Sequence, residues 1–160
     1  MSFISNFIDK LTKMGAYLSA FILVSLVSLI LIEIFIRSLF DMSTMIADEY
    51  SGYFYLASIF FGLAYTFSSD SHIRINIITS RLSKKVNRKI DILAALITLA
   101  VLAFALYRTA LFTYDSYSLE MLSENVSETP LYLTQLAMPI GITMFMLAVV
   151  LFIFKGFTND

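Results

Sequence analysis

The sequence has no cysteine and no tryptophan, and only one histidine, two prolines and five glycines among 160 residues. Without cysteine there is no disulfide, no thiolate metal site and no cysteine nucleophile. The single histidine, His72, cannot supply bis-histidine ligation of a haem or metal, and we expect no Ser-His-Asp or Cys-His catalytic set. So little glycine also provides no Gly-rich phosphate loop. These absences predict a chain that is not an enzyme and holds no cofactor and no metal.

Charge is scarce as well. Charged residues make up 14% of the sequence, against roughly 25% in soluble domains. The net charge of −1 gives no sign of a nucleic-acid partner. Hydrophobic residues make up 59%, with a mean hydropathy of +0.82, whereas soluble domains contain about 45–50% apolar residues. A soluble chain this short could not bury so much apolar surface.

The excess apolar residues fall in four long segments. About 20 mostly apolar residues cross the roughly 30 Å of hydrocarbon in a bilayer. The predicted spans cover residues of about 14–40, 50–69, 92–114 and 129–154. Pro139 lies in the fourth span, where we expect a kink. Proline is tolerated within a membrane helix because neighbouring groups can satisfy the carbonyl that it leaves free. The N-terminal run lacks a small-residue cleavage site, so we expect a retained helix and not a removed signal peptide.

Basic and acidic residues lie at opposite ends of these spans. The basic residues precede the first span, separate the second from the third, and follow the fourth: Lys10, Lys13, Arg74, Arg81, Lys84, Lys85, Arg88, Lys89 and Lys155. The other two connections hold acidic residues: Asp41, Asp48, Glu49, Asp115, Glu120, Glu124 and Glu128. Because Lys and Arg remain on the cytoplasmic side, both termini are predicted to be cytoplasmic. The fold class is therefore an all-α integral membrane protein of four transmembrane helices, a single domain over residues 1–160.

The connection between the second and third spans, residues 70–91, interleaves apolar and basic residues. Its later apolar residues recur at every fourth position, which is helical spacing: Ile78, Leu82, Val86 and Ile90. This pattern predicts a basic amphipathic segment at the cytoplasmic interface. The residues predicted to contact membrane phospholipid are Arg81, Lys84, Lys85, Arg88 and Lys89. A simpler and compatible interpretation is that these residues only enforce the topology and touch anionic lipid.

Ionisable residues within or beside a span are costly, and each is a functional hypothesis. Glu33 and Arg37 lie four residues apart with the acid first, the favourable order for a helical pair. We prefer a structural ion pair at the outer end of the first helix over a role in ion conduction. Asp48 and Glu49 could meet Arg37 across the short hairpin and hold the first helix to the second.

Two further residues are candidates for contacts. Arg108, late in the third span, is an interface anchor with Asp115 as a possible partner, or alternatively a contact with a second protein. His72 lies where the second span leaves the membrane, and a lone histidine is more often a hydrogen-bonded structural group than a ligand. Small residues of the third span permit close helix contact, namely Ala94, Ala95, Thr98, Ala100, Ala103 and Ala105.

Four short motifs then follow one another along the chain. They are the runs at residues 36–40 (Ile-Arg-Ser-Leu-Phe), 47–49 (Ala-Asp-Glu), 62–65 (Gly-Leu-Ala-Tyr) and 71–76 (Ser-His-Ile-Arg-Ile-Asn). Their order and spacing resemble the small membrane subunit of TRAP transporters, the DctQ-like family. That family has an Arg-X-X-Phe motif ending helix one, an acidic pair opening helix two and a His-Ile-Arg motif after helix two. The resemblance covers the whole chain.

The chain departs from the family pattern at three positions. Ile46 stands where the family often has Trp, and Ser43 where it often has Pro. Asn76 replaces the usual Asp. The first change removes the aromatic side chain at that point, and the last removes an ionic partner for the basic cluster.

The resemblance implies a non-catalytic small subunit of a sodium-coupled, binding-protein-dependent TRAP transporter that imports an organic acid. It implies a bacterial inner-membrane location and two protein partners, a large elevator-type membrane subunit (M component) and a periplasmic substrate-binding protein (P component). The small subunit would brace the scaffold of the large one and help form the periplasmic docking surface. The substrate is chosen by residues of other chains. The structural or partner-contact residues are then Glu33, Arg37, Asp48, Glu49, His72, Arg74 and Arg108.

Two other functions remain as alternatives. A membrane-anchor subunit of a redox or signalling complex would need cofactor ligands in its spans, and one interfacial histidine argues against haem. A small independent channel or multidrug exporter keeps a membrane-embedded carboxylate, whereas Glu33 is expected near Arg37 and near the surface.

Overall fold

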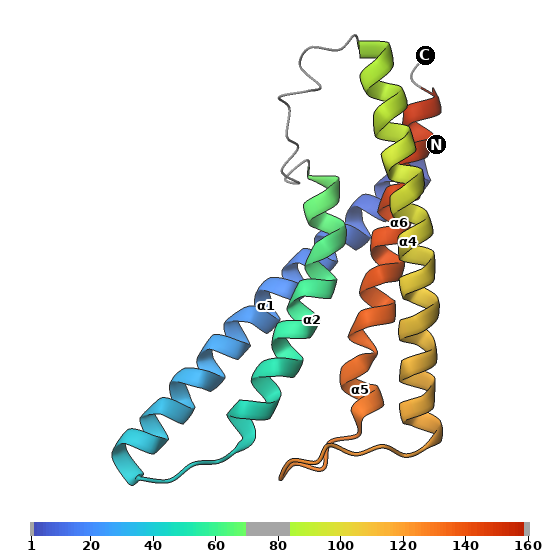
Figure 1. Cartoon of the computed structure of the whole chain (residues 1–160). Helices are drawn as coiled ribbons and strands as arrows, with labels where there is room; N and C mark the ends of the chain where they lie inside the picture. The colour runs from blue at the N-terminus through green and yellow to red at the C-terminus, as the bar shows by residue number, and fades with distance from the viewer. Residues whose placement is uncertain (1, 70–83, 159–160) are drawn as a thin grey trace.

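The computed structural model describes residues 2–69 and 84–158 of the chain, and this part is almost entirely helical (Figure 1). The helices are α1 (Ser2–Phe40), α2 (Ile46–Ser68), α4 (Lys84–Ser118), α5 (Leu131–Gln135) and α6 (Ala137–Thr158). The only extended pairing among the described residues is an isolated bridge between Leu122 and Pro130. The prediction of an all-α protein is therefore confirmed for this part of the chain.

Three stretches of the described residues are long and apolar enough to cross a membrane. They are Ile4–Phe40, Val86–Ser118 and Leu131–Gly156, with mean hydropathies of 2.6, 2.4 and 2.5. α2 is not among them, because tyrosine, serine and threonine dilute its apolar residues. The prediction of four spans is thus not confirmed: the structure supports three, and the missing one is the second.

The helices also extend beyond the predicted spans. α1 begins at Ser2 and not near residue 14, and its 39 residues rise about 60 Å at 1.5 Å per residue. That is about twice the hydrocarbon thickness of a bilayer. α4 begins at Lys84, so the last part of the predicted amphipathic segment forms the first turns of this helix. The earlier part of that segment lies outside the described residues.

The helices form two arms (Figure 1). α1 lies along α2 in one arm, while α4 lies along α5 and α6 in the other. Both termini and the start of α4 lie at one end of the molecule. The arms diverge toward the other end, which holds the connection from α1 to α2 and the connection from α4 to α5. α6 is the central helix, because it packs against α2 and α4 and also contacts α1.

The core follows from this position of α6. Val149 of α6 and Ala64 of α2 are fully buried, and Ala95 and Leu102 of α4 pack into the same cluster. Phe67 of α2 contacts the rings of Phe145 and Phe152, with centroid distances of 5.4 and 5.5 Å. Aromatic rings prefer such tilted or edge-on contacts at this separation.

Glycines allow α1, α2 and α6 to approach one another closely. A Cβ atom added to Gly141 of α6 would lie 2.5 Å from the carbonyl oxygen of Phe60 in α2. One added to Gly15 of α1 would lie 2.8 Å from the carbonyl oxygen of Phe61. Ser19 Oγ of α1 donates a hydrogen bond of 2.6 Å to the Ser58 carbonyl of α2 nearby. Small residues thus build this contact, as in other membrane helix pairs. Of the small residues predicted in the third span, Ala95 is buried in the core cluster that α4 forms with α6.

The fourth predicted span is broken near Pro139, as expected. α5 ends at Gln135 and α6 begins at Ala137. Pro139 has no N–H to donate to the carbonyl of Gln135, four residues earlier, so the regular helical pattern fails there. The helix resumes with the Ile140 N–H bonded to the Leu136 carbonyl at 3.3 Å.

The Gly141 contact predicts that Gly141→Ala destabilises the chain by about 1–3 kcal/mol, the usual cost of overpacking, because the clash is with backbone. Gly52→Ala is the matched control: nothing lies within 4 Å of its added Cβ, and alanine favours a helix more than glycine does. Thermal unfolding in detergent, followed by circular dichroism, compares the two. Equal melting temperatures would contradict the close contact.

Candidate functional site

The first candidate site lies at the turn that joins α1 to α2. α1 ends at Phe40, and the chain reverses before α2 begins at Ile46. Asp41 and Met45 have φ angles of 50° and 56°, in the left-handed region that suits a tight reversal. The turn brings the start of α2 against the last turns of α1, so polar groups of the two helices can meet.

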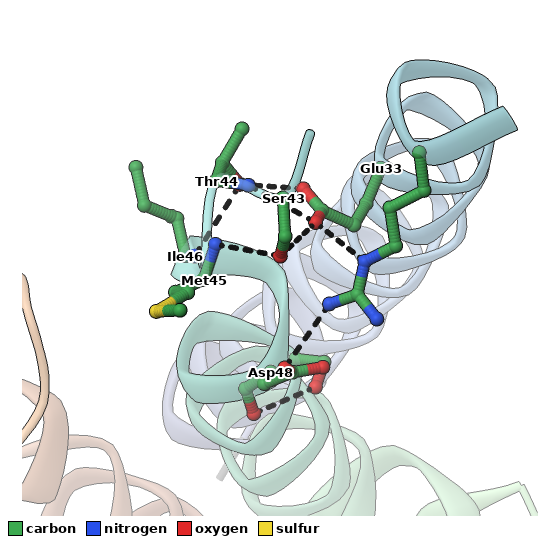
Figure 2. A network of polar contacts seen from close by, with 8 residues as sticks. Glu33, Ser43, Thr44, Met45, Ile46 and Asp48 are labelled. Carbon is green, nitrogen blue, oxygen red and sulfur yellow. Dashed lines mark hydrogen bonds and ion pairs between the residues drawn. The ribbon is translucent and has the colours of Figure 1, made fainter. Parts of the chain in front are cut away.

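Glu33 is at the centre of this site. Its Oε1 accepts hydrogen bonds from Arg37 Nε at 2.8 Å, from Ser43 Oγ at 2.8 Å and from the Thr44 N–H at 3.1 Å. Its Oε2 accepts one from Thr44 Oγ1. Figure 2 shows the carboxylate directed toward Ser43 and Thr44. We call Glu33, Arg37, Ser43, Thr44 and Asp48 the Glu33 network.

The two hydroxyls of the network also reach the start of α2. Ser43 Oγ accepts a hydrogen bond from the Met45 N–H at 3.2 Å, and Thr44 Oγ1 accepts one from the Ile46 N–H at 3.3 Å. The first N–H groups of a helix have no partner within the helix. The carboxylate therefore orients the hydroxyls, and the hydroxyls in turn satisfy backbone donors where α2 begins.

Arg37 links the two helices directly. Its Nη2 lies 3.2 Å from Asp48 Oδ2 in the first turns of α2. The Glu33 side chain is 7% exposed, whereas the Arg37 and Asp48 side chains are 48% and 78% exposed. Exposed ion pairs contribute little, so the buried carboxylate and its donors hold the hairpin more firmly than the pair of Arg37 with Asp48. The predicted contact of Arg37 across the hairpin is present through Asp48.

Glu49 belongs to a second site, the Glu49 cluster, formed with Tyr50, Tyr53, Ser127 and Thr129. Its carboxylate accepts hydrogen bonds from Tyr53 at 2.8 Å and from Ser127 at 2.6 Å. Ser127 and Thr129 share a hydrogen bond of 2.6 Å, and Thr129 shares one of 2.9 Å with Tyr50. The cluster fastens α2 to the connection between α4 and α5, 78 residues further along the chain.

Glu49 lies in the first turn of α2, just before the predicted span at 50–69. The Ser123 and Ser127 hydroxyls, and then Tyr53, lower the pKa of its carboxyl against the opposing effect of burial. Hydrogen bonds donated to the charged form favour that form. The hydroxyls therefore favour the carboxylate form of this buried group, and among the described residues no cation forms an ion pair with it.

The structure separates the other predicted residues from these two sites. Arg108 is exposed on α4 and makes no ion pair with Asp115 or any other described residue. Arg88 Nε donates a hydrogen bond of 2.7 Å to the Gly156 carbonyl in the last turns of α6, and its Nη2 donates to the same oxygen. A cation there also complements the helix dipole. Lys89 is exposed.

Several predicted residues are not placed by the structure. His72, Arg74 and Arg81 lie outside the described residues. Lys84 and Lys85 belong to the first turn of α4, but their side chains are not described. Contact of the basic residues with phospholipid stays a prediction.

Some residues of the sites carry a weak sequence signal. Ser43, Thr44, Tyr53 and Ser127 were not predicted as site residues, although Ser43 stands where proline is frequent in the resembling family. Serine and threonine hydroxyls often accept hydrogen bonds from backbone N–H groups two residues further on, so the Ser-Thr pair before α2 carries a weak signal for this turn. The hydrogen bond from Ser127 to Glu49 has no signal in the neighbouring sequence, because it depends on how α2 packs against the connection between α4 and α5.

The described residues offer buried carboxylates held by hydroxyls and a guanidinium, and no group of three or more metal-binding side chains. Such an arrangement can fasten helices together. With apolar helices long enough to cross a membrane, it defines a membrane-embedded helical protein whose polar groups pair at the helix ends.

The comparison with known families agrees with this class. The chain belongs to the DctQ component family of tripartite ATP-independent periplasmic transporters, whose model matches residues 26–159. A Haemophilus influenzae protein classed as a TRAP transporter small permease protein is 25% identical over 130 residues, which cover 81% of this chain and 77% of that protein. The expected family is therefore confirmed.

The Glu33 network predicts that Glu33→Gln lowers the melting temperature in detergent by several degrees, because the amide accepts fewer of the four donated hydrogen bonds and loses the charge that Arg37 meets. Asp48→Asn should have a smaller effect, since that side chain is largely exposed. Asp41→Asn is the control, because Asp41 is exposed and asparagine tolerates its left-handed φ. Equal melting temperatures for the three variants would contradict the stabilising role of Glu33.

The Glu49 cluster predicts a dependence on pH. A lowered folded pKa stabilises the fold above the unfolded pKa of the carboxyl, and the contribution is lost as the pH falls through the folded pKa. Glu49→Gln should therefore melt below the native chain at pH 7, and the difference should shrink below about pH 4. Ser127→Ala should also make the melting temperature depend less on pH, because it removes a hydrogen bond donated to the Glu49 carboxylate. A constant difference between pH 7 and pH 3 would exclude an ionised Glu49.

Proposed function

We propose that this chain is the non-catalytic small membrane subunit of a sodium-coupled TRAP transporter that imports an organic acid. In this role it packs against the large membrane subunit, enlarges and anchors its static scaffold, and contributes to the surface that receives the periplasmic substrate-binding protein. The family and the relative support the transporter assignment. The bracing role is supported by the surface of the chain itself.

The observation that carries the bracing role is the amount of apolar surface left uncovered. In the most apolar stretches of α1 and α4, 6% of residues are buried within the chain, against 39% in α5 and α6. Exposed side chains include Tyr17, Phe21 and Phe35 of α1 and Phe104 of α4. A brace needs such faces, because it presents them to lipid and to a neighbouring subunit.

The proposed topology has four spans with both termini in the cytoplasm of a bacterium, across the inner membrane. α2 is included because it packs along α1 and α6, so a membrane that those helices cross also surrounds α2. Tyr50, Tyr53 and Tyr55 gather near its start, which suits the membrane–water interface. The end of the molecule that holds the start of α1, the start of α4 and the end of α6 (Figure 1) is in accord with a cytoplasmic location, because these helix ends carry basic residues, namely Lys10, Lys13, Arg88, Lys89 and Lys155.

The proposal predicts that the chain copurifies with a large multi-span membrane protein and that sodium-driven uptake in proteoliposomes requires both. Arg37→Glu should reduce assembly or uptake severalfold without changing which organic acid is preferred, because it places a further carboxylate beside Glu33 and Asp48 at the turn between α1 and α2. Asp41→Asn serves as the control in the same turn. Full uptake by the large subunit alone would contradict the bracing role.

A further inference from the structure

Arg108 is the one charged residue between Asp91 and Asp115. It lies in α4, within the stretch Val86–Ser118 that is apolar enough to cross a membrane. Asp115 lies seven residues further on, which is about 10 Å along a helix. Asp91 lies about 25 Å away in the other direction by the same rise. A span bounded by these two residues therefore holds the guanidinium of Arg108 inside its apolar part.

The side chain lies opposite the face by which α4 packs on α6. That packing face contains Ala95, Leu102 and Thr113, all buried. Arg108 is exposed, and its neighbours on the same outer face, at helical spacings of seven, four and four residues, are Val101, Phe104 and Phe112. These are 61%, 67% and 54% exposed, so the guanidinium emerges from an apolar surface that the chain does not cover.

Glu33, by contrast, is a charged residue of an apolar helix that has its partners within the chain. Glu33 of α1 accepts hydrogen bonds from Arg37, Ser43 and Thr44 of the chain itself. Arg37 likewise pairs with Glu33 and Asp48, whereas no ion pair or hydrogen bond joins the Arg108 side chain to another described residue. A charge in a membrane span is usually paired, so the partner of Arg108 is expected to come from outside the chain.

Two observations favour a protein carboxylate over a lipid phosphate. Side chains on a helix lean toward its N-terminus, so Arg108 leans toward Phe104 and away from the nearer end of α4. That nearer end is also acidic, with Asp115, Glu120 and Glu124 exposed, and these groups repel anionic headgroups. A guanidinium and a carboxylate, by contrast, form a bidentate pair that suits a dry contact.

We propose that Arg108 forms an ion pair with an Asp or Glu on a membrane-spanning helix of the large subunit, and that this helix packs on the outer face of α4 around Phe104. The inference rests on the proposed function, because it takes the large subunit as the partner. Beyond that function, it names α4 as the helix that the large subunit covers and an ion pair with a carboxylate as the contact.

The first test measures recovery of the large subunit with affinity-purified small subunit from co-expressing membranes. Arg108→Gln and Arg108→Glu should reduce recovery roughly tenfold or more, as for loss of one member of a buried charge pair, and Arg108→Lys should retain part of it. Lys155→Gln is the control, because it removes an exposed cation near the other end of the membrane and should leave recovery unchanged.

The second test identifies the partner residue in the large subunit. A photo-crosslinking phenylalanine analogue at position 104 should join to a large-subunit peptide that contains an Asp or Glu, and the same probe combined with Arg108→Glu should not. Replacing that acidic residue by Arg should restore recovery to the Arg108→Glu chain. Helix content and melting of each variant in detergent, if equal to the native chain, exclude loss through misfolding.

The outcomes are distinct. If the native chain recovers no large membrane protein, the proposed function fails before any variant is compared. If the native chain recovers it, but the probe joins only to phospholipid or Arg108→Glu recovers it equally, the ion pair alone is overturned. If an Arg108 variant unfolds, the test is the crosslink from position 104 in the chain that keeps Arg108. A crosslink to a large-subunit peptide with an Asp or Glu supports the ion pair, and a crosslink only to phospholipid overturns it.

Discussion

A carboxylate inside an apolar helix must find its hydrogen bonds within reach, and much of this structure follows from how Glu33 finds them. Its partners come from the turn after α1 and from α1 itself. The turn therefore cannot relax into another shape without leaving a buried charge short of donors, which is far more costly than a lost exposed pair. Because Ser43 and Thr44 also bond the start of α2, one carboxylate fixes both the end of one helix and the beginning of the next.

Two kinds of contact hold the arms together. Where α2 packs against α1 and α6, the helices meet through glycine and serine, so backbone lies against backbone and dispersion contacts dominate. Away from the termini the arms diverge (Figure 1), and the connection between them is polar. There the Glu49 cluster joins α2 to the segment before α5. The close helix contact and the hydrogen-bonded link from α2 to the connection between α4 and α5 thus add to a small hydrophobic core.

The sequence was sufficient where the signal is local. Apolar length predicted the helices, the spacing of Glu33 and Arg37 predicted their ion pair, and Pro139 predicted the break near Leu136. It was insufficient where the answer depends on packing. Adjacent Asp48 and Glu49 look alike in sequence, yet one faces α1 and the other a segment 78 residues away. Gly141 likewise shows its importance only once Phe60 lies against it. α2 carries a weaker apolar signal than the other long helices, because tyrosines and serines interrupt its apolar residues.

The position of the Glu33 partners has a consequence for how the protein is made. Glu33 is synthesised before Ser43, Thr44 and Asp48, so α1 leaves the ribosome with a carboxylate that has only Arg37 to meet it. The remaining donors arrive about ten residues later, with the turn that starts α2. A lone first helix would enter lipid with that charge poorly satisfied. Glu33 therefore has all its hydrogen-bond partners once the chain through Thr44 has been made, whereas Glu49 receives its hydrogen bond from Ser127 only after α4.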